Sequence, residues 1–126
     1  MNSLNSIILE GNLVRDPELK ETGKGKKLCT FTVASNRFFK LGDEYQKEVS
    51  YFDITTWERL AEVCAEYLKK GRGVRITGRL KQDQWKNQDG TGRSRVYIIA
   101  DQVEFKPQPK TETSQNTDDD IAGEVF

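Results

Sequence analysis

Alternation of apolar and polar positions is clearest in the stretch YFDITTW, near the middle of the chain. Its β-branched and aromatic residues recur with a period of two, which predicts a β-strand. Phe52 and Ile54 fall on one face and are expected in the core. The other face holds Asp53 between two large rings, Tyr51 and Trp57. A polar face that also carries two rings predicts a binding surface.

The same pattern predicts four more strands and one helix. The other strands are expected at residues 4–14, 28–37, 73–85 and 93–105. A charged loop is expected between the first two of them. Residues 58–70 predict a helix, because apolar residues recur at i, i+3, i+4, i+7 and i+8. This apolar stripe consists of Leu60, Val63, Cys64, Tyr67 and Leu68.

Strands and helix in the order β-β-β-α-β-β define the expected fold class. We predict a mainly β protein, a five-stranded Greek-key barrel with the helix between its third and fourth strands. This layout is that of the oligonucleotide/oligosaccharide-binding (OB) fold. A possible capping box, Thr55 to Glu58, leaves open whether Trp57 ends its strand or enters the first helical turn.

The character of the chain changes at Lys106. Residues 106–117 contain prolines and polar residues without periodicity, which predicts a disordered linker. Residues 106–126 hold two of the 20 basic and five of the 20 acidic residues. The body therefore has a net charge of about +3 and the tail about −3, which suggests an anionic partner for the body. The acidic tip, residues 118–126, suits docking to a partner protein through Asp118, Asp119, Asp120, Ile121, Val125 and Phe126.

Composition argues against catalysis. The chain has no histidine, the commonest general base and metal ligand. It has no catalytic triad pattern, phosphate-binding glycine loop or metal-spaced cluster, so we expect no enzyme activity, no cofactor and no metal. Cys29 and Cys64 lie among apolar neighbours, and we expect two buried free thiols, with a disulfide as the alternative. No signal peptide or membrane-spanning run is present, which favours the cytoplasm and excludes a membrane partner.

Aromatic and basic residues occur together on the polar faces of the predicted strands. Single-stranded nucleic acid is bound by rings that stack on bases and by cations that follow the phosphates. One exposed ring is often only a partly buried edge, but four rings among basic residues are better explained by such binding. The rings are Phe39, Tyr51, Trp57 and Trp85, and the cations are Arg37, Lys40, Arg75, Arg79, Lys81 and Arg95.

Several segments resemble the bacterial single-stranded DNA-binding proteins of the replication type. The matching segments are IILEGNL at 7–13 with DPE at 16–18, FTVAS at 31–35, LAEV at 60–63, EYLKKG at 66–71, ITGRL at 76–80, Trp85 before DG at 89–90, and DDDI at 118–121. The tip departs from the usual family ending, Asp-Asp-Ile-Pro-Phe, because the proline is absent and the terminal Phe is displaced.

The resemblance implies a function and an assembly. Residues 1–105 would bind and protect single-stranded DNA in replication, recombination and repair, and the tip would recruit enzymes of those processes. It also implies a homotetramer with the strand around residues 7–13 at a subunit interface. The family's stacking positions fall on the same four rings, although the adjacent Phe38 leaves the choice of Phe39 open.

Two other functions fit parts of the pattern. An interaction or assembly module related to primosome proteins would act mainly through protein contacts, although that branch typically lacks an acidic tip. An RNA-binding protein of the cold-shock type is disfavoured by the chain length and by the helix.

Asp53 is the unexpected member of the binding face, because an acid should repel phosphate. The repulsion would be relieved if a neighbouring cation such as Arg37 or Arg79 paired with Asp53. We predict that Asp53→Asn leaves DNA binding unchanged or tightens it.

Overall fold

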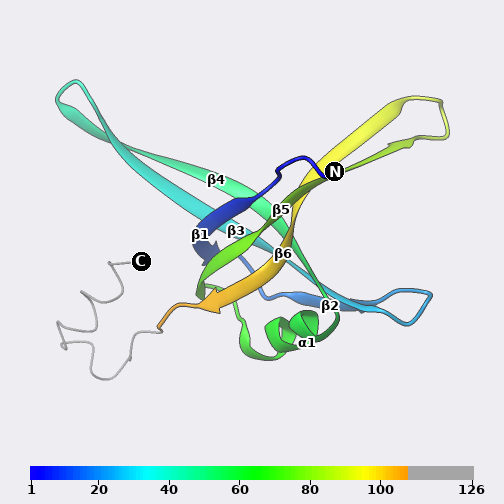
Figure 1. The fold of residues 1–126 in the computed structure, drawn as a ribbon. Coiled ribbons are helices and arrows are strands. Elements are labelled where there is room, and N and C mark those ends of the chain that lie inside the picture. Colours follow the sequence, from blue (N-terminus) through cyan, green and yellow to red (C-terminus); the bar gives the residue numbers. More distant parts are fainter. Residues whose placement is uncertain (108–126) are drawn as a thin grey trace.

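The computed structural model describes residues 1–107, so the expected acidic tip and most of the expected linker lie outside the described residues. Its elements are β1 (Ile7–Leu13), β2 (Glu18–Glu21), β3 (Lys27–Leu41), β4 (Glu44–Trp57), α1 (Glu58–Tyr67), β5 (Gly73–Lys86) and β6 (Gly92–Phe105). Figure 1 shows the strands crossing around a common centre, with α1 packed at one end.

Five of these strands close a barrel. The hydrogen-bonded order is β1-β5-β6-β4-β3, and β1 pairs again with β3 through Asn12 and Leu13. All pairings are antiparallel except β4 with β6, where Ile54 lies beside Ile98. Closure leaves no long sheet edge around most of the barrel. This topology, with the helix between the third and fourth barrel strands, confirms the predicted OB fold.

Two glycines allow barrel strands to approach closely. A Cβ atom on Gly11 would lie 2.2 Å from the carbonyl oxygen of Ala34, and one on Gly78 would lie 2.1 Å from that of Ile99. The β5–β6 register also shifts between Thr77 and Gly78. The close approach at Gly11 is between β1 and β3, and the one at Gly78, where the register shifts, is between β5 and β6.

The core is formed by alternate residues of the barrel strands and by one face of α1. Cys29 and Cys64 are both free and fully buried, as predicted. Burial raises the pKa of Cys29 to about 11 and that of Cys64 to about 12, so both thiols stay protonated at neutral pH. The predicted helical stripe was partly wrong. Ala61 is buried on this face, while Tyr67 is exposed and packs near Phe105.

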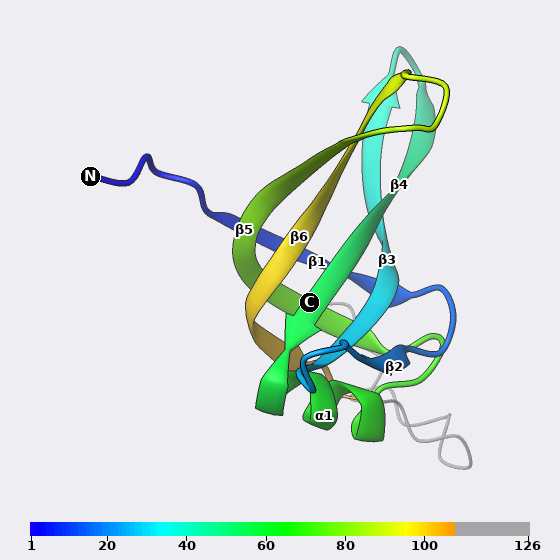
Figure 2. The ribbon, with the colours of Figure 1, turned by 90° about the vertical axis from the view of Figure 1, so that its right-hand side faces the viewer.

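Two hairpins extend beyond the barrel as arms, formed by β3–β4 and by β5–β6. Figure 2 shows both rising from the end of the barrel opposite α1. The β3–β4 arm is longer than the sequence predicted, because pairing continues to Leu41 and Glu44. A two-residue turn joins its strands, and Gly42 supplies the positive φ of 66° that such a turn requires at its first central position.

Two boundary predictions were wrong, and the open question about Trp57 is answered. The charged loop contains β2, whose four exposed residues pair with β3 from Lys27 to Thr30. The helix ends at Tyr67 and not at residue 70. No capping box forms, because no side chain caps the helix and Trp57 remains at the end of β4 in extended conformation.

Candidate nucleic-acid interface

One outer face of the barrel collects polar and aromatic side chains from four strands. Residues that pair across neighbouring strands point to the same side of a sheet. On this face Tyr51 pairs with Ala34, and Asp53 pairs with Thr32. Tyr51 and Asp53 are exposed, whereas Ile54, the next residue along the chain, is fully buried, so Tyr51 and Asp53 point outward from the barrel. We call this surface the outer face of β3, β4, β6 and β5.

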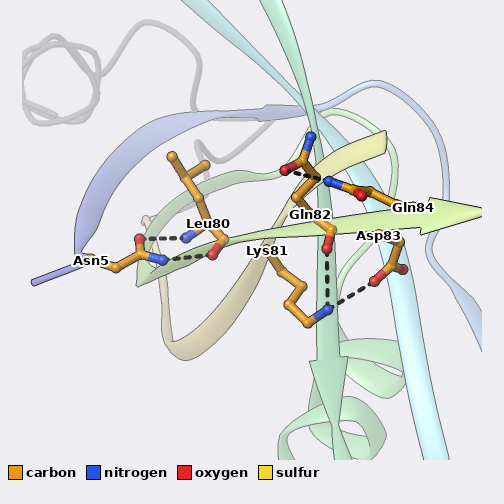
Figure 3. A network of polar contacts seen from close by, with 6 residues as sticks. All are labelled: Asn5, Leu80, Lys81, Gln82, Asp83 and Gln84. Carbon is orange, nitrogen blue, oxygen red and sulfur yellow. Dashed lines mark hydrogen bonds and ion pairs between the residues drawn. The ribbon is translucent and has the colours of Figure 1, made fainter. Parts of the chain in front are cut away.

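The hairpin of β5 and β6 continues the same face. Lys81 pairs with Tyr97, Asp83 with Arg95 and Trp85 with Arg93. Lys81 and Asp83 point to one side of β5, whereas Leu80 and Gln82 point to the other (Figure 3). Because Ile98, opposite Leu80, is buried, the side that carries Lys81 is the outer one.

Three of the four predicted rings are exposed on the outer face. Relative exposure is 66% for Tyr51, 37% for Trp57 and 47% for Trp85. A ring that packed in the core would be nearly inaccessible, so none of these three serves mainly as a core residue. Their exposed π-faces are available to stack on bases.

Phe39 lies on the opposite side of the β3–β4 ladder from Tyr51. It pairs with Gln46, and the guanidinium of Arg37 lies 4.7 Å from its ring centroid. The adjacent Phe38 is in phase with Tyr51 and is 70% exposed. A two-stranded ribbon twists strongly, so the two sides of the arm turn progressively relative to the barrel. A strand of DNA that follows this twist can therefore meet a ring on either side.

Most predicted cations lie beside a carboxylate. The nitrogen–oxygen distances are 4.0 Å for Arg37–Glu48, 3.7 Å for Arg79–Asp101, 2.9 Å for Lys81–Asp83 and 3.7 Å for Arg95–Asp53. Lys40 lies 5.7 Å from the ring centroid of Tyr45. Exposed ion pairs contribute only about 0–1 kcal/mol each, so phosphates can compete for these cations.

Arg75 has different surroundings from the other predicted cations. Its side chain donates to Glu10 at 2.7 Å, and a second carboxylate, Glu104, lies 3.6 Å away. These partners come from β1 and β6 and hold the guanidinium between two strands of the barrel. Arg75 therefore links β5 to both of its neighbouring strands, and its predicted contact with DNA stays a prediction.

Asp53 has neither of the partners expected for it. Its carboxylate accepts a hydrogen bond from the Thr32 hydroxyl at 2.9 Å and lies 3.7 Å from Arg95. Arg37 and Arg79 pair with other acids. The neighbouring cation is therefore Arg95 and not Arg37 or Arg79, because β4 lies beside β6 and this pairing joins segments far apart in the chain.

Tyr97 is a site residue that the sequence reasoning missed. It lies on the outer face opposite Lys81, and the Arg95 guanidinium lies 5.0 Å from its ring centroid. Burial raises the pKa of Tyr97, and its hydrogen bond to Asp83 raises it further. The pKa of Asp83 is lowered, chiefly by a hydrogen bond from Lys81. In the sequence, Tyr97 alternates in phase with Arg93 and Arg95, and this pattern could have identified Tyr97 as a residue of the same face.

The base of the β5–β6 arm is held by the N-terminal segment. The Asn5 side chain donates to the Leu80 carbonyl at 2.8 Å and accepts from the Leu80 amide at 3.0 Å. Figure 3 shows this pair of hydrogen bonds beside Lys81 and Asp83. Asn5 thus pairs with the backbone of β5 just before β1 begins at Ile7, at the position from which the arm extends.

Neither a metal cluster nor a membrane helix is part of this site. Within residues 1–107, no group of three or more His, Cys, Asp or Glu side chains is placed to hold a metal ion. In the same part of the chain, no helix has the length and apolarity needed to cross a membrane.

Comparison with known proteins identifies the family. The model of the single-strand binding protein family matches residues 4–106, and the chain belongs to this family. The single-stranded DNA-binding protein of Treponema pallidum is 46% identical over 105 residues, which cover 83% of this chain and 59% of that protein. Single-stranded DNA-binding protein 2 of Chlorobaculum tepidum is 36% identical over 125 residues, which cover 98% and 82%.

A solved structure has the same fold. The Plasmodium falciparum SSB complex with single-stranded DNA superposes with a TM-score of 0.75 at 27% identity, covering 83% of this chain and 96% of that one. The family and the fold were both expected from the resemblance, and both are confirmed.

Proposed function

We propose that this protein binds single-stranded DNA largely without regard to base sequence. The observation that carries the proposal is the outer face, where the exposed rings of Tyr51, Trp57 and Trp85 share one surface with the cations Lys81 and Arg95. Stacking is tolerant of sequence because every base has a π-face, and it contributes about 1–3 kcal/mol per base. Family membership and the DNA complex of the structural relative support the same function.

Fluorescence titration with a dT homopolymer tests this proposal. Trp57 and Trp85 are partly exposed, so stacking should quench their emission as DNA binds. Affinity should fall with salt, with log K decreasing by about 0.7 per unit of log[salt] for each phosphate contacted. Duplex DNA of the same length should bind more weakly, because its bases are already stacked. The absence of quenching and of binding at low salt would contradict the proposal.

Phe39 is expected to be the stacking ring of the β3–β4 arm. It is half-buried, whereas Phe38 is 70% exposed, so less conformational entropy is lost when a base stacks on Phe39 than on Phe38. Phe39→Ala should weaken dT binding by about 1–3 kcal/mol. The matched variant Phe38→Ala should weaken it less. If Phe38→Ala weakened dT binding more than Phe39→Ala in the same titration, the DNA would be assigned to the side of the arm that carries Phe38.

The cellular role that we propose is protection of single-stranded DNA in replication, recombination and repair. The acidic tip, residues 118–126, would recruit the enzymes of these processes. A deletion of the tip should leave dT affinity within about twofold of the full chain, since stacking and phosphate contacts both lie in the barrel. It should also abolish capture of partner proteins by the DNA-bound chain. Loss of DNA binding on deletion would show that body and tail do not act separately.

We also propose a homotetramer with β1 at a subunit interface. Residues 7–11 of β1 pair with β5 on one side only, because pairing with β3 is limited to Asn12 and Leu13. An open strand edge is a template for pairing with another chain. Ile8 on this strand is 69% exposed, which adds an apolar contact. Light scattering with and without a long oligonucleotide measures the subunit number and the stoichiometry.

A further inference from the structure

A small polar pocket lies on the outer face of the barrel, beside the strand that carries Tyr51. It has a volume of about 190 Å³ and lies where the β1–β2 connection meets β3, β4 and β6. Asp53, Arg95, Thr32 and Arg15 are among the residues that line it, together with two further acids, Asp16 and Glu18. Asp53 is two residues from Tyr51 on the same strand face, a distance of about 6.6 Å along a β-strand. A base stacked on Tyr51 would therefore lie within reach of this pocket.

The Asp53 carboxylate is fixed in orientation but remains accessible. The Thr32 hydroxyl donates to Oδ1 at 2.9 Å, and Arg15 Nη2 in turn donates to the Thr32 hydroxyl oxygen at 3.5 Å. Arg95 Nη2 lies 3.7 Å from Oδ2, too far for a strong hydrogen bond. The Asp53 side chain is 51% exposed. Since an ionised carboxylate has about four lone-pair sites, free acceptor positions remain on both oxygens.

An acceptor-only group distinguishes bases by their hydrogen-bond donors. Guanine offers two parallel donors on its Watson–Crick edge, N1–H and the 2-amino group, which match the two oxygens of a carboxylate. Cytosine and adenine each offer one amino group. Thymine offers a single N3–H between two carbonyls, and both carbonyls would face the carboxylate unfavourably. Unstacked bases of a single strand are commonly read on this edge.

We propose that Asp53, oriented by Thr32 and Arg15, accepts hydrogen bonds from N1–H and the 2-amino group of guanine. Arg95 lies beside the same carboxylate and is placed to donate to guanine O6. The pocket thus adds a local preference for guanine to a binding mode that is otherwise independent of sequence. This inference rests on the proposed function, because it requires that single-stranded DNA lies on the outer face.

Inosine provides the test, because it is guanine without the 2-amino group. Oligonucleotides of repeated TG, of repeated TI and of dT alone, equal in length, are titrated against the full-length protein. We expect about fivefold tighter binding of the TG repeat than of the TI repeat, at the lower end of the range for a bidentate base contact. Asp53→Asn should reduce this ratio to about one. On dT alone, Asp53→Asn should bind as tightly as the natural chain or more tightly, because a charge that repels phosphate is removed.

Asp83→Asn is the matched control. Asp83 is another acid on the outer face, but it is hydrogen-bonded to Lys81 and does not line this pocket. Its substitution should leave the TG to TI ratio unchanged. Equal binding of the two repeats by the natural chain, or a ratio that survives Asp53→Asn, would overturn the guanine pocket. Failure to bind any of the three oligonucleotides would instead contradict the proposed function.

Discussion

Replacing both Trp57 and Trp85 by alanine is expected to weaken binding of dT oligonucleotides at least 30-fold. Each ring lies on the outer face with its surface partly open to solvent, and the two come from different hairpins. Because a stacked ring contributes about 1–3 kcal/mol per base, two independent rings should contribute about 2–6 kcal/mol together. The loss is measured by competition or filter binding, since the double variant has no tryptophan to report quenching.

The control for this variant is Tyr67→Ala. Tyr67 is also exposed and aromatic, but it lies on α1 at the opposite end of the barrel from the arms. Its substitution should change dT affinity by less than about twofold, because no base is expected to reach it. Comparable losses in both variants would show that the effect follows from destabilisation and not from lost stacking.

Gly78→Ala is expected to destabilise the barrel by about 3 kcal/mol or more, the upper end of the range for overpacking. The added Cβ would lie 2.1 Å from the Ile99 carbonyl oxygen and 2.9 Å from the Ala100 Cα atom. Both are backbone atoms of β6, so the clash cannot be relieved by a change of rotamer. β5 and β6, whose pairing holds the base of one arm, would have to move apart at this point. Urea unfolding followed by circular dichroism measures the loss.

Gly23→Ala is the matched control for Gly78. A Cβ atom on Gly23 would have no heavy atom within 4 Å, and Gly23 does not adopt a positive φ. Its unfolding midpoint should therefore match that of the natural chain or rise slightly. If Gly78→Ala were as stable as Gly23→Ala, the close approach of β5 and β6 at this point would be wrong.

The strands of the barrel could be predicted because one face of each is buried. Apolar residues such as Ile54 and Ile76 alternate with polar ones because they contact the core, so the local sequence pattern is enough to predict these strands. In the arms neither face is buried, so apolar and polar residues do not alternate there. Between the barrel and the tip of the β3–β4 arm, residues such as Lys47 and Glu48 pair across the hairpin, and both faces of the arm are largely exposed. Their polarity therefore suggested a loop. β2 was missed for the same reason, since all four of its residues are exposed.

The candidate rings could be predicted individually, but their partners could not. An aromatic residue in phase with charged residues is visible in the sequence, as for Trp85. The pairing of Asp53 with Arg95 depends on β4 lying beside β6, which is a consequence of barrel closure. The phase of Phe39 depends on the register of the β3–β4 arm, set by the two-residue turn at Gly42. Long-range register therefore decides which predicted residues act together.

Photochemical cross-linking tests most directly whether the outer face binds DNA. The full-length protein is irradiated with a dT oligonucleotide, and the cross-linked peptides are identified by mass spectrometry. The proposed path predicts adducts on the peptides that contain Tyr51, Trp57 and Trp85, suppressed by excess unlabelled single strand. Adducts confined to the peptides of Tyr67 and Phe105, at the helix end of the barrel, would contradict the assignment of the outer face as the DNA-binding surface.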